Sequence, residues 1–489
     1  MTAIREADTS ILPDPLPYIG GGRPASVGGG SFQHVYAATG RPTVEVPLAG
    51  PDDVDRAVAA ARGAAREWRA IRPDVRRRLL WDLARAIEAH ADELTAIQVL
   101  ENGTPAIASG AFPQMVIDGL EYYAGWPDKL IGQVNPVWPV SGLDYSVLEP
   151  YGVAVVIIPW NSPLYSLGSV VAPALTAGNT IVVKPPELTP FTSLRFAELA
   201  AEVGFPPGVI NIVPGGGEVG SALVSHPDID MIHFTGSGPT ATRILEAAAR
   251  TLTPVALELG GKSPNLVFAD ADLEAAAAGA VQYCMQVSGQ GCLNGTRLIV
   301  ENTVYDDVVD LVRQHVGALR VGDPAEPTTT FGPVINESAA DRILGMIRRA
   351  EKESGGRIVA GGDRLGGDLA DGYYVAPTVI ADVREQSEIA REEVFGPVLS
   401  VLRFQGDDDA LRIANDTRYG LGSYVQTSDL TRAHRFADEI DAGMVWVNGT
   451  GGLPPSIPFG GDKQSGIGRL GGRYGIEEFS RVKNVWIAL

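Results

Sequence analysis

The apolar stretch VAVVII at residues 153–158 runs directly into Pro159-Trp160-Asn161, and four similar runs follow it. These runs occupy residues 180–183, 209–213, 231–234 and 254–258. Ala-rich segments with helical spacing separate them. Continuous apolar strands that alternate with helices are typical of a parallel sheet covered on both faces. Such a sheet binds ligands at the carboxyl ends of its strands, so we expect the functional site there.

A second alternation of helices and strands begins after Asp270 and runs to about residue 450. Its predicted helices cover residues 272–288, 304–318 and 431–440, and its predicted strands cover residues 297–301, 357–360 and 397–403. Upstream, we expect a loose arm with short strands over 1–50, helices over 52–102 and 111–126, and an extended hairpin over 131–151. The predicted fold class is therefore α/β with a small β extension.

Composition narrows the class of protein. The chain has 489 residues, enough for two or three domains, and a net charge of −20, which argues against a nucleic-acid partner. Two cysteines cannot build a disulfide framework, so a reducing cytoplasm is the expected location. The start of the chain lacks an apolar signal core, and the longest apolar run is too short to span a bilayer, so we expect no membrane partner. The six histidines show no metal-binding spacing, so no metal site is expected.

Cys292 carries the strongest chemical signal, because glycines flank it in the run SGQGCL at residues 288–293. A thiolate nucleophile needs a base for its own proton or for that of a water, and Glu258, at the end of an apolar Gly-rich strand, can serve. Taken alone, a free cysteine is also explained as a small buried hydrophobe. Cys284, on a predicted helix, is expected to be such a buried structural residue.

Three strand ends carry features of a cofactor site. GGGEVG at 215–220 fits G-x-G-x-x-G, but it follows the third strand and lacks the acidic partner of a dinucleotide fingerprint, so packing glycines and phosphate contact both stay open. KPPE at 184–187 places a carboxylate where it accepts ribose hydroxyls and repels a 2′-phosphate, which favours NAD over NADP. FTGS at 234–237 opens a helix whose free amides suit a pyrophosphate. An exposed loop and an ordinary helix cap are the alternatives for the last two runs.

Asn161 ends the first strand of the sheet, where its amide can donate to a developing oxyanion. Surface asparagines are common in turns, so this residue alone does not decide the question.

Together these segments resemble the aldehyde dehydrogenase superfamily, in its NAD(P)-dependent, non-acylating type, over essentially the whole chain. The matching motifs are PWN at 159–161, KPPE at 184–187, FTGS at 234–237, ELGGK at 258–262, GQGC at 289–292, EVFGP at 393–397 and PFGG at 458–461. Seven motifs in family order and spacing are very specific.

The resemblance implies an architecture. A Rossmann-like NAD-binding domain would comprise residues 1–130 and 152–259, and an α/β catalytic domain residues 260–465. A small β oligomerisation arm would comprise residues 131–151 and 466–489. Similar proteins are homodimers or homotetramers, in which the 131–151 hairpin and the strand Val482–Ile487 join subunits.

The resemblance also implies a mechanism. Cys292 would attack the aldehyde carbon to give a thiohemiacetal, while the Asn161 side chain and the Cys292 backbone amide form the oxyanion hole. Hydride transfer to the nicotinamide would leave a thioester, and Glu258 would activate the water that releases the carboxylic acid. Lys184 and Glu187 would hold the adenosine ribose, and Ser237 the pyrophosphate. The full set of expected cofactor residues is Trp160, Lys184, Glu187, Gly217, Gly236, Ser237, Gly260, Glu393, which would bind the nicotinamide ribose, and Phe395, which would pack near the nicotinamide ring.

The expected substrate pocket contains small residues where relatives often carry bulky ones. Ser162, Ser166 and Ser169 would face the tunnel, and the expected neighbours are Met115, Tyr165, Leu293 and Phe459. We predict a roomy, mainly apolar pocket for a medium or large aldehyde, aromatic or branched. The alternative is that larger residues of the 451–457 loop fill this space. No well-placed arginine is evident for a substrate carboxylate, which disfavours semialdehydes.

Some positions depart from the family pattern. Gly238 and Ala241 stand where Thr and Gly are common, which bears on cofactor affinity. Val170 and Leu470 stand where many members carry a Lys and a Glu proposed to pass protons from the base. We hypothesise that the proton leaves by another route, such as bulk water in the tunnel; the alternative is that the pair is never essential.

The leading hypothesis is thus NAD-dependent oxidation of an aldehyde to its acid in the cytoplasm. A CoA-acylating semialdehyde dehydrogenase is a rival, although relatives of that kind usually lack the glutamate found at Glu258. A non-catalytic scaffold of the same fold is another rival, and retention of Cys292, Glu258 and Asn161 argues against it.

Overall fold

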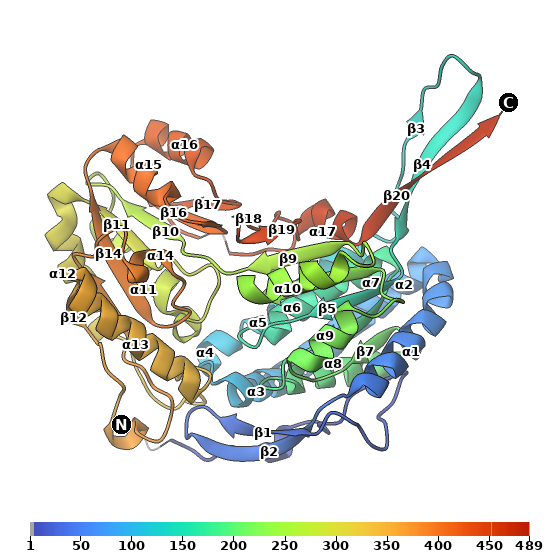
Figure 1. The fold of residues 1–489 in the computed structure, drawn as a ribbon, viewed down its shortest axis with the longest axis horizontal. Helices are drawn as coiled ribbons and strands as arrows, with labels where there is room; N and C mark the ends of the chain where they lie inside the picture. The colour runs from blue at the N-terminus through green and yellow to red at the C-terminus, as the bar shows by residue number, and fades with distance from the viewer. Residues whose placement is uncertain (1–3, 451, 489) are drawn as a thin grey trace.

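The chain folds around two mainly parallel sheets, which Figure 1 shows at different ends of the body. They are seen in a computed structural model that describes residues 4–450 and 452–488. The first sheet has the strand order β19-β9-β8-β5-β6-β7. Its strands are β5 (Val153–Ile157), β6 (Thr180–Lys184), β7 (Ile210–Ile212), β8 (Met231–Gly236), β9 (Val255–Leu259) and the antiparallel β19 (Gly466–Ile467). The first five lie within two residues of the predicted runs, so the α/β fold class is confirmed.

Strand order reverses at β5, because β6 follows on one side and β8 on the other. Such a switch point leaves a crevice at the carboxyl ends of the two diverging strands. Trp160 and Asn161 follow β5, and Ser237 follows β8, so the topology brings these segments to the same edge.

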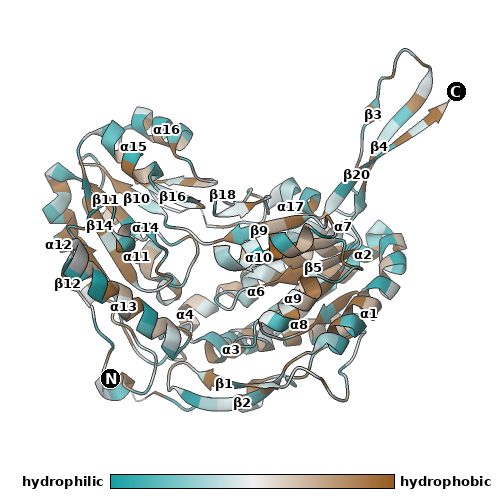
Figure 2. Cartoon of the chain, viewed as in Figure 1, coloured by the Kyte–Doolittle hydropathy of each residue, from teal (hydrophilic) through white to brown (hydrophobic). Residues whose placement is uncertain are grey.

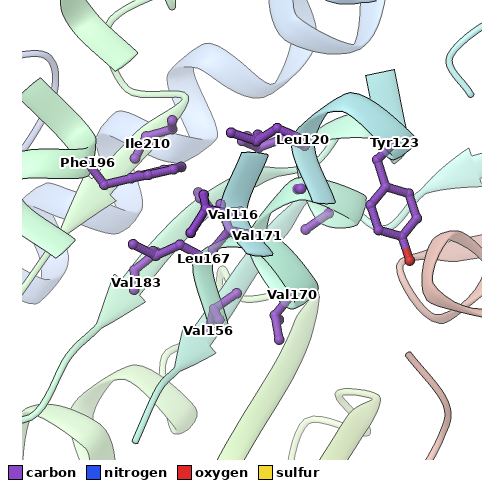
Figure 3. Close-up of a cluster of buried hydrophobic side chains, with 14 of the residues drawn as sticks. Val116, Leu120, Tyr123, Val156, Leu167, Val170, Val171, Val183, Phe196 and Ile210 are labelled. Carbon is purple, nitrogen blue, oxygen red and sulfur yellow. The ribbon is translucent and has the colours of Figure 1, made fainter. Parts of the chain in front are cut away.

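Helices cover both faces of this sheet because side chains alternate along each strand. Ala154 and Val156 of β5 belong to one core, while Val153, Val155 and Ile157 belong to the other. The first core packs against α2 (Pro73–Ala89), α5 (Phe112–Ala124), α7 (Ala172–Ala177) and α8 (Phe191–Glu202). The second packs against α1 (Pro51–Ala70), α9 (Gly217–Val224) and α10 (Gly238–Ala248). Figure 3 shows side chains of the first core, and in Figure 2 the apolar colours concentrate on the enclosed strands.

The helical region predicted over 52–102 consists of three helices, α1, α2 and α3 (Ala91–Asn102). Pro73 opens α2, and a proline there favours extended backbone at the preceding residue. The helix predicted over 111–126 corresponds to α5.

The second sheet has the order β12-β13-β14-β11-β10-β16-β17, with β12 antiparallel to its neighbour. Its strands are β10 (Pro264–Val267), β11 (Arg297–Glu301), β12 (Arg357–Ala360), β13 (Thr378–Ala381), β14 (Val398–Phe404), β16 (Gly422–Gln426) and β17 (Met444–Val447). One face packs against α11 (Leu273–Met285) and α12 (Tyr305–Gly317). The other packs against α13 (Glu337–Ser354), α14 (Glu388–Arg391), α15 (Asp407–Asn415) and α16 (Leu430–Glu439).

The prediction of a helix to residue 288 was wrong at its end. The α-helix α11 stops at Met285, because Val287 and Ser288 adopt left-handed backbone with φ of 52° and 53°. A left-handed residue cannot continue a right-handed helix. This break turns the chain toward Cys292.

A β arm projects from the body in Figure 1 and carries the C-terminal strand. It consists of β3 (Val134–Asn135), β4 (Gly142–Pro150) and β20 (Ser480–Ala488), and β4 pairs with β20 along its whole length. Near the start of the chain, β1 (Ser31–Tyr36) pairs with β2 (Arg41–Pro47). The other elements are η1 (Thr9–Ile11), α4 (Ala106–Ser109), α6 (Pro163–Ser166), η2 (Leu167–Val171), η3 (Gln286–Gly289), η4 (Asn302–Val304), η5 (Gly367–Leu369), β15 (Tyr419–Gly420), β18 (Asp462–Lys463) and α17 (Gly472–Glu478). Within the described ranges, no helix has the length and apolarity needed to cross a bilayer.

Candidate active site

A cavity lies at the carboxyl ends of the first sheet's strands. It encloses about 1400 Å³ of empty space, part of it open to solvent. Both halves of the molecule line it, with Asn161 and Glu258 from the first sheet and Cys292 and Glu393 from segments near the second. The predicted residues that line it are Trp160, Asn161, Ser162, Tyr165, Ser166, Ser169, Lys184, Gly236, Ser237, Glu258, Gly260, Cys292, Glu393, Phe395 and Phe459.

Cys292 reaches this cavity on a loop that depends on close backbone contacts. A Cβ atom on Gly289, which has φ of 78°, would lie 2.2 Å from the carbonyl carbon of Gly396. A Cβ atom on Gly261 would lie 2.7 Å from the carbonyl oxygen of Cys292. Only glycine fits at such distances. Removal from bulk water raises the pKa of the Cys292 thiol to about 12, and the negative charges of Glu393 and Glu258 add to the rise.

Asn161 is buried and its amide already has one partner. The amide nitrogen donates to the carbonyl of Gln290 at 2.8 Å. Gln290 is fixed in turn, because its side-chain oxygen accepts from the backbone N–H of Ile335 at 2.9 Å. A primary amide has two N–H groups, so one of them is left to donate to an oxyanion. The sequence did not predict the bond to Gln290, which fixes the rotamer of Asn161.

Glu258 lies on β9 with 5% of its surface exposed. Its Oε2 atom has no hydrogen-bond partner among the described residues. Burial raises the pKa of this carboxyl group well above its usual range, while Arg469 lowers it and Glu478 raises it further. A carboxyl group with a raised pKa and a free oxygen is suited to accept a proton.

Glu393 is held in place, unlike Glu258. Its Oε1 atom accepts from the backbone N–H of Gly261 at 3.0 Å, and a Cβ atom on Gly260 would lie 2.0 Å from its Oε2 atom. Burial raises the pKa of Glu393 to about 7, against the effect of the Gly261 N–H and of nearby cations. Phe395 adopts left-handed backbone with φ of 46°, and its ring meets that of Trp160 edge-on at 5.3 Å.

The other predicted cofactor residues follow the strand ends, but they do not all line the cavity. Lys184 is buried, and burial lowers its pKa to about 8. Ser237 is the N-cap residue of α10, and its hydroxyl donates to Thr240 without capping the helix amides. Those first-turn amides suit an anionic ligand. Glu187 lies outside the lining, 3.9 Å from the position of a Cβ atom on Gly216.

The glycine run at 215–220 shows a packing role at its first position. A Cβ atom on Gly215 would lie 2.3 Å from the side chain of Val219. Gly217 is the first residue of α9, and a Cβ atom there would meet nothing within 4 Å. Steric need therefore explains Gly215 and not Gly217.

A second cavity of about 480 Å³ adjoins the first and shares Tyr165, Ser169, Phe459 and Leu470 with it. Met115 lines it, as do Leu453, Pro454, Pro455 and Ile457 of the 451–457 loop, of which Gly451 lies outside the described residues. Leu293 instead lies beside Gly422.

The wall of this second cavity, called the passage below, includes a close contact between two glycines. A Cβ atom on Gly119 of α5 would lie 2.5 Å from the carbonyl oxygen of Gly168, so the two segments can approach this closely only with glycine. Gly168 lies in the π-helical turn η2, a departure from regular helix that is frequent at functional sites.

The structure locates the four residues that depart from the expected family pattern. Val170 and Leu470 are buried and line the main cavity, as Glu258 does. Gly238 opens α10 with open space around its Cβ position, and Ala241 is a buried residue of the same helix.

Sequence reasoning missed Arg342, which lines the cavity from α13 and donates to the carbonyl of Val394 at 2.6 Å, next to Glu393. No motif surrounds it, and only its position on a helix facing the EVFGP segment gives it this contact.

Comparisons with known proteins agree with this geometry. The sequence pattern described as "Aldehyde dehydrogenase family" matches residues 25–485. A putative aldehyde dehydrogenase from Burkholderia cenocepacia is 42% identical, with 97% of each chain covered and a TM-score of 0.95. PnpE from Pseudomonas sp. WBC-3, solved in complex with nicotinamide adenine dinucleotide, is 42% identical, with 97% of each chain covered and a TM-score of 0.94. Betaine aldehyde dehydrogenase (betB) from Staphylococcus aureus, in complex with NAD⁺, is 34% identical with a TM-score of 0.96, covering 99% of this chain and 97% of its own.

Proposed function

The chain belongs to the aldehyde dehydrogenase family, and from this premise we infer that it uses NAD to oxidise an aldehyde to the carboxylic acid. The observation that carries this function is the meeting of Cys292, Asn161 and Glu258 in one cavity with the strand ends of a switch point. Residues 1–130 and 152–259 form the NAD-binding domain in this proposal, and 260–465 the catalytic domain. Residues 131–151 and 466–489 form the arm, although β19 in the last range pairs with β9.

The residues present fit NAD. Buried Lys184 lines the cavity without a hydrogen bond from its ammonium group to the described residues, and the first-turn amides of α10 face no capping side chain. Lys184 and Glu187 would hold the adenosine ribose, Ser237 the pyrophosphate and Glu393 the nicotinamide ribose. The carboxylate of Glu187 favours NAD over NADP, because it repels a 2′-phosphate. When bound, the nicotinamide supplies the acceptor for a hydride.

In acylation, the sulfur of Cys292 adds to the aldehyde carbon, and the thiol proton leaves to a base or water. The second N–H of Asn161 and the backbone N–H of Cys292 donate to the alkoxide that forms. As the carbonyl reforms, the aldehyde C–H bond breaks with loss of hydride, and a thioester remains on Cys292.

In deacylation, Glu258 removes a proton from the water that attacks the thioester carbon. The tetrahedral intermediate then collapses, the C–S bond breaks, and Cys292 leaves as a thiolate with release of the acid. Because Val170 and Leu470, which line the same cavity, are apolar, Glu258 would return its proton to bulk water through the passage. Val170→Lys combined with Leu470→Glu tests this route, since a faster release of acid in single turnover would show that a relay is missing.

The substrate we propose is a medium or large apolar aldehyde. The passage beyond Tyr165 is lined mostly by apolar groups, and Asp118 is its one charged residue within the described chain. A carboxylate at this entrance disfavours anionic semialdehydes. One added methylene in an apolar pocket is worth about 10- to 200-fold in specificity, so kcat/KM for benzaldehyde should exceed that for acetaldehyde at least tenfold. A preference for acetaldehyde would refute the proposal.

The partner we propose for the arm is a second copy of this chain, giving a homodimer or homotetramer. Large apolar side chains stand exposed on it, with Trp138 at 84%, Val134 at 75% and Val482 at 71% exposure. Patches of this kind mark interaction sites. Light scattering of the purified protein should give a dimer or tetramer mass, and a monomer would contradict the assignment.

The decisive experiment measures NADH or NADPH formation with a panel of aldehydes, with NAD and NADP side by side. Cys292→Ala should abolish turnover, whereas Cys284→Ala, the matched change at a buried cysteine outside the cavity, should retain it. Turnover that survives Cys292→Ala would overturn the mechanism. A requirement for CoA would favour the acylating rival, and no turnover in the wild-type protein would favour a scaffold.

A further inference from the structure

The charged groups that act on Glu258 do not come from the apolar part of the cavity lining. Val170, Leu470 and Phe459 line the same cavity as Glu258 and are buried and apolar. β19 pairs with β9 at Glu258, and the chain continues from β19 through Arg469 into α17. Two charged residues of this segment, Arg469 and Glu478, act on the pKa of Glu258, the first lowering it and the second raising it.

Gly460 separates Glu258 from Arg469. A Cβ atom on Gly460 would lie 3.0 Å from Oε1 of Glu258 and 2.8 Å from Cδ of Arg469. The carboxyl group and the arginine side chain therefore contact the same glycine backbone. Any larger residue at Gly460 would push them apart.

Arg469 is fixed in this position by several partners. Its Nη1 atom donates to the carbonyl oxygens of Gly461 and Gly468, each at 2.9 Å, and its Nη2 atom pairs with Asp462. A guanidinium does not release its proton in proteins, so Arg469 cannot relay protons and acts by its charge.

Glu478 of α17 supplies a second charge beside the first. Its Oε2 atom accepts from the backbone N–H of Arg469 at 2.9 Å, and a Cβ atom on Gly468 would lie 2.3 Å from the same oxygen. Burial raises the pKa of Glu478 as well. The carboxylate of Glu478 is thus fixed against the backbone of Gly468 and Arg469.

We propose that Arg469 and Glu478 are positioning residues that set the charge state of Glu258 from behind the sheet edge, with opposite signs. This rests on the proposed function, in which Glu258 is the base for deacylation. Among the described residues, the other titratable groups that interact electrostatically with Glu258 are Cys292 and Tyr165, and both are neutral near pH 7 because burial raises the pKa of each. The arginine favours the carboxylate form, and Glu478 opposes it.

The test is the pH dependence of acid release from the acyl-enzyme, measured by rapid quench in single turnover with benzaldehyde and NAD. Glu478→Gln keeps the acceptor for the Arg469 N–H and removes a negative charge, so the rising limb should move to lower pH by about one unit. Arg469→Met should move it to higher pH by a similar amount, and Arg469→Lys should restore it. Glu477→Gln is the matched control, because Glu477 on the same helix pairs with Arg473.

A second readout is independent of turnover. The rate of Cys292 alkylation by iodoacetamide, followed against pH without NAD or aldehyde, should show the same opposite shifts and lose them in a Glu258→Gln background. If the proposed function is wrong, the wild type will not oxidise aldehydes. The alkylation rate of Cys292 would still report on the effect of Arg469 and Glu478. If Arg469→Met does not fold, the proposal is tested by the pH shifts of Glu478→Gln and Arg469→Lys. Shifts in the same direction for Glu478→Gln and Arg469→Met, or a shift for Glu478→Gln no larger than that for Glu477→Gln, would overturn the proposal.

Discussion

Glu258 and Glu393 line the same cavity, and burial raises the pKa of both carboxyl groups, yet their surroundings differ. Glu393 accepts a backbone hydrogen bond from Gly261 and is pressed against Gly260, with cations nearby. Glu258 has an oxygen without a partner among the described residues and apolar neighbours on the cavity side. A carboxylate that is fixed by hydrogen bonds and packing is suited to bind a ligand in a defined geometry. A carboxylate with an oxygen that lacks a hydrogen-bond partner is suited to exchange a proton. In the proposed function, one cavity therefore gives two chemically identical groups different tasks through the contacts that each of them makes.

The largest expected effect comes from Glu258→Gln, which keeps the shape of the side chain and removes the base. Steady-state turnover should fall about a thousandfold, because general base catalysis contributes roughly 10²- to 10⁴-fold. Acylation should survive, so NADH should appear in a burst of about one equivalent per site and then stop. The measurement is stopped-flow absorbance of NADH.

Glu393→Gln is the control for that variant. It should raise KM for NAD and slow NADH formation without a burst, because acylation itself is impaired. A burst in Glu393→Gln and none in Glu258→Gln would reverse the two assignments.

An intermediate effect is expected from Gly260→Ala. The new Cβ atom would lie 2.0 Å from Oε2 of Glu393, so the carboxylate must move. A misplacement of about 1 Å near the reacting groups costs up to about 100-fold, and we expect a 10- to 100-fold loss in kcat/KM for NAD. Gly63→Ala on α1, where a Cβ atom meets nothing within 4 Å, is the matched control. It should leave kcat/KM unchanged and stabilise the helix by up to about 1 kcal/mol. Equal activity of both variants would show that Glu393 has room to move.

The comparison also shows what the sequence could predict. The strands β5 to β9 are mainly apolar runs separated by helical segments, and this alternation let the sequence predict their places and the segments after them. The placement of Asn161, Glu258 and Cys292 in one cavity matches the expectation from motifs, although their chemical roles stay a proposal.

The unpredicted parts depend on contacts between distant segments. β19 has two residues and no periodicity, yet it pairs with β9 at Glu258, and the segment after it places Arg469 against Gly460, next to Glu258. The left-handed turn at Val287 and Ser288 comes directly before the close approach of Gly289 to Gly396, a contact between distant segments that no local propensity encodes. For the same reason the sequence did not predict that Leu293 would lie beside Gly422, or that Arg342 would hold the segment before Phe395.

The smallest effect we predict is a pH dependence of NAD binding that belongs to Glu393. Burial raises the pKa of its carboxyl group to about 7, so the group is neutral below that pH and ionised above it. Ribose hydroxyls donate more strongly to a carboxylate than to a carboxylic acid, and the difference is worth about 1 kcal/mol. The Kd for NAD should therefore rise about threefold to fivefold as pH falls from about 8 to about 6. Quenching of Trp160 fluorescence reports binding without turnover, so the titration of Glu258 does not enter through kcat. Glu393→Gln should give a Kd independent of pH in this range, whereas Glu258→Gln should keep the wild-type profile. If the pH dependence of Kd disappears in Glu258→Gln and persists in Glu393→Gln, then the carboxylate of Glu258, and not that of Glu393, governs cofactor binding.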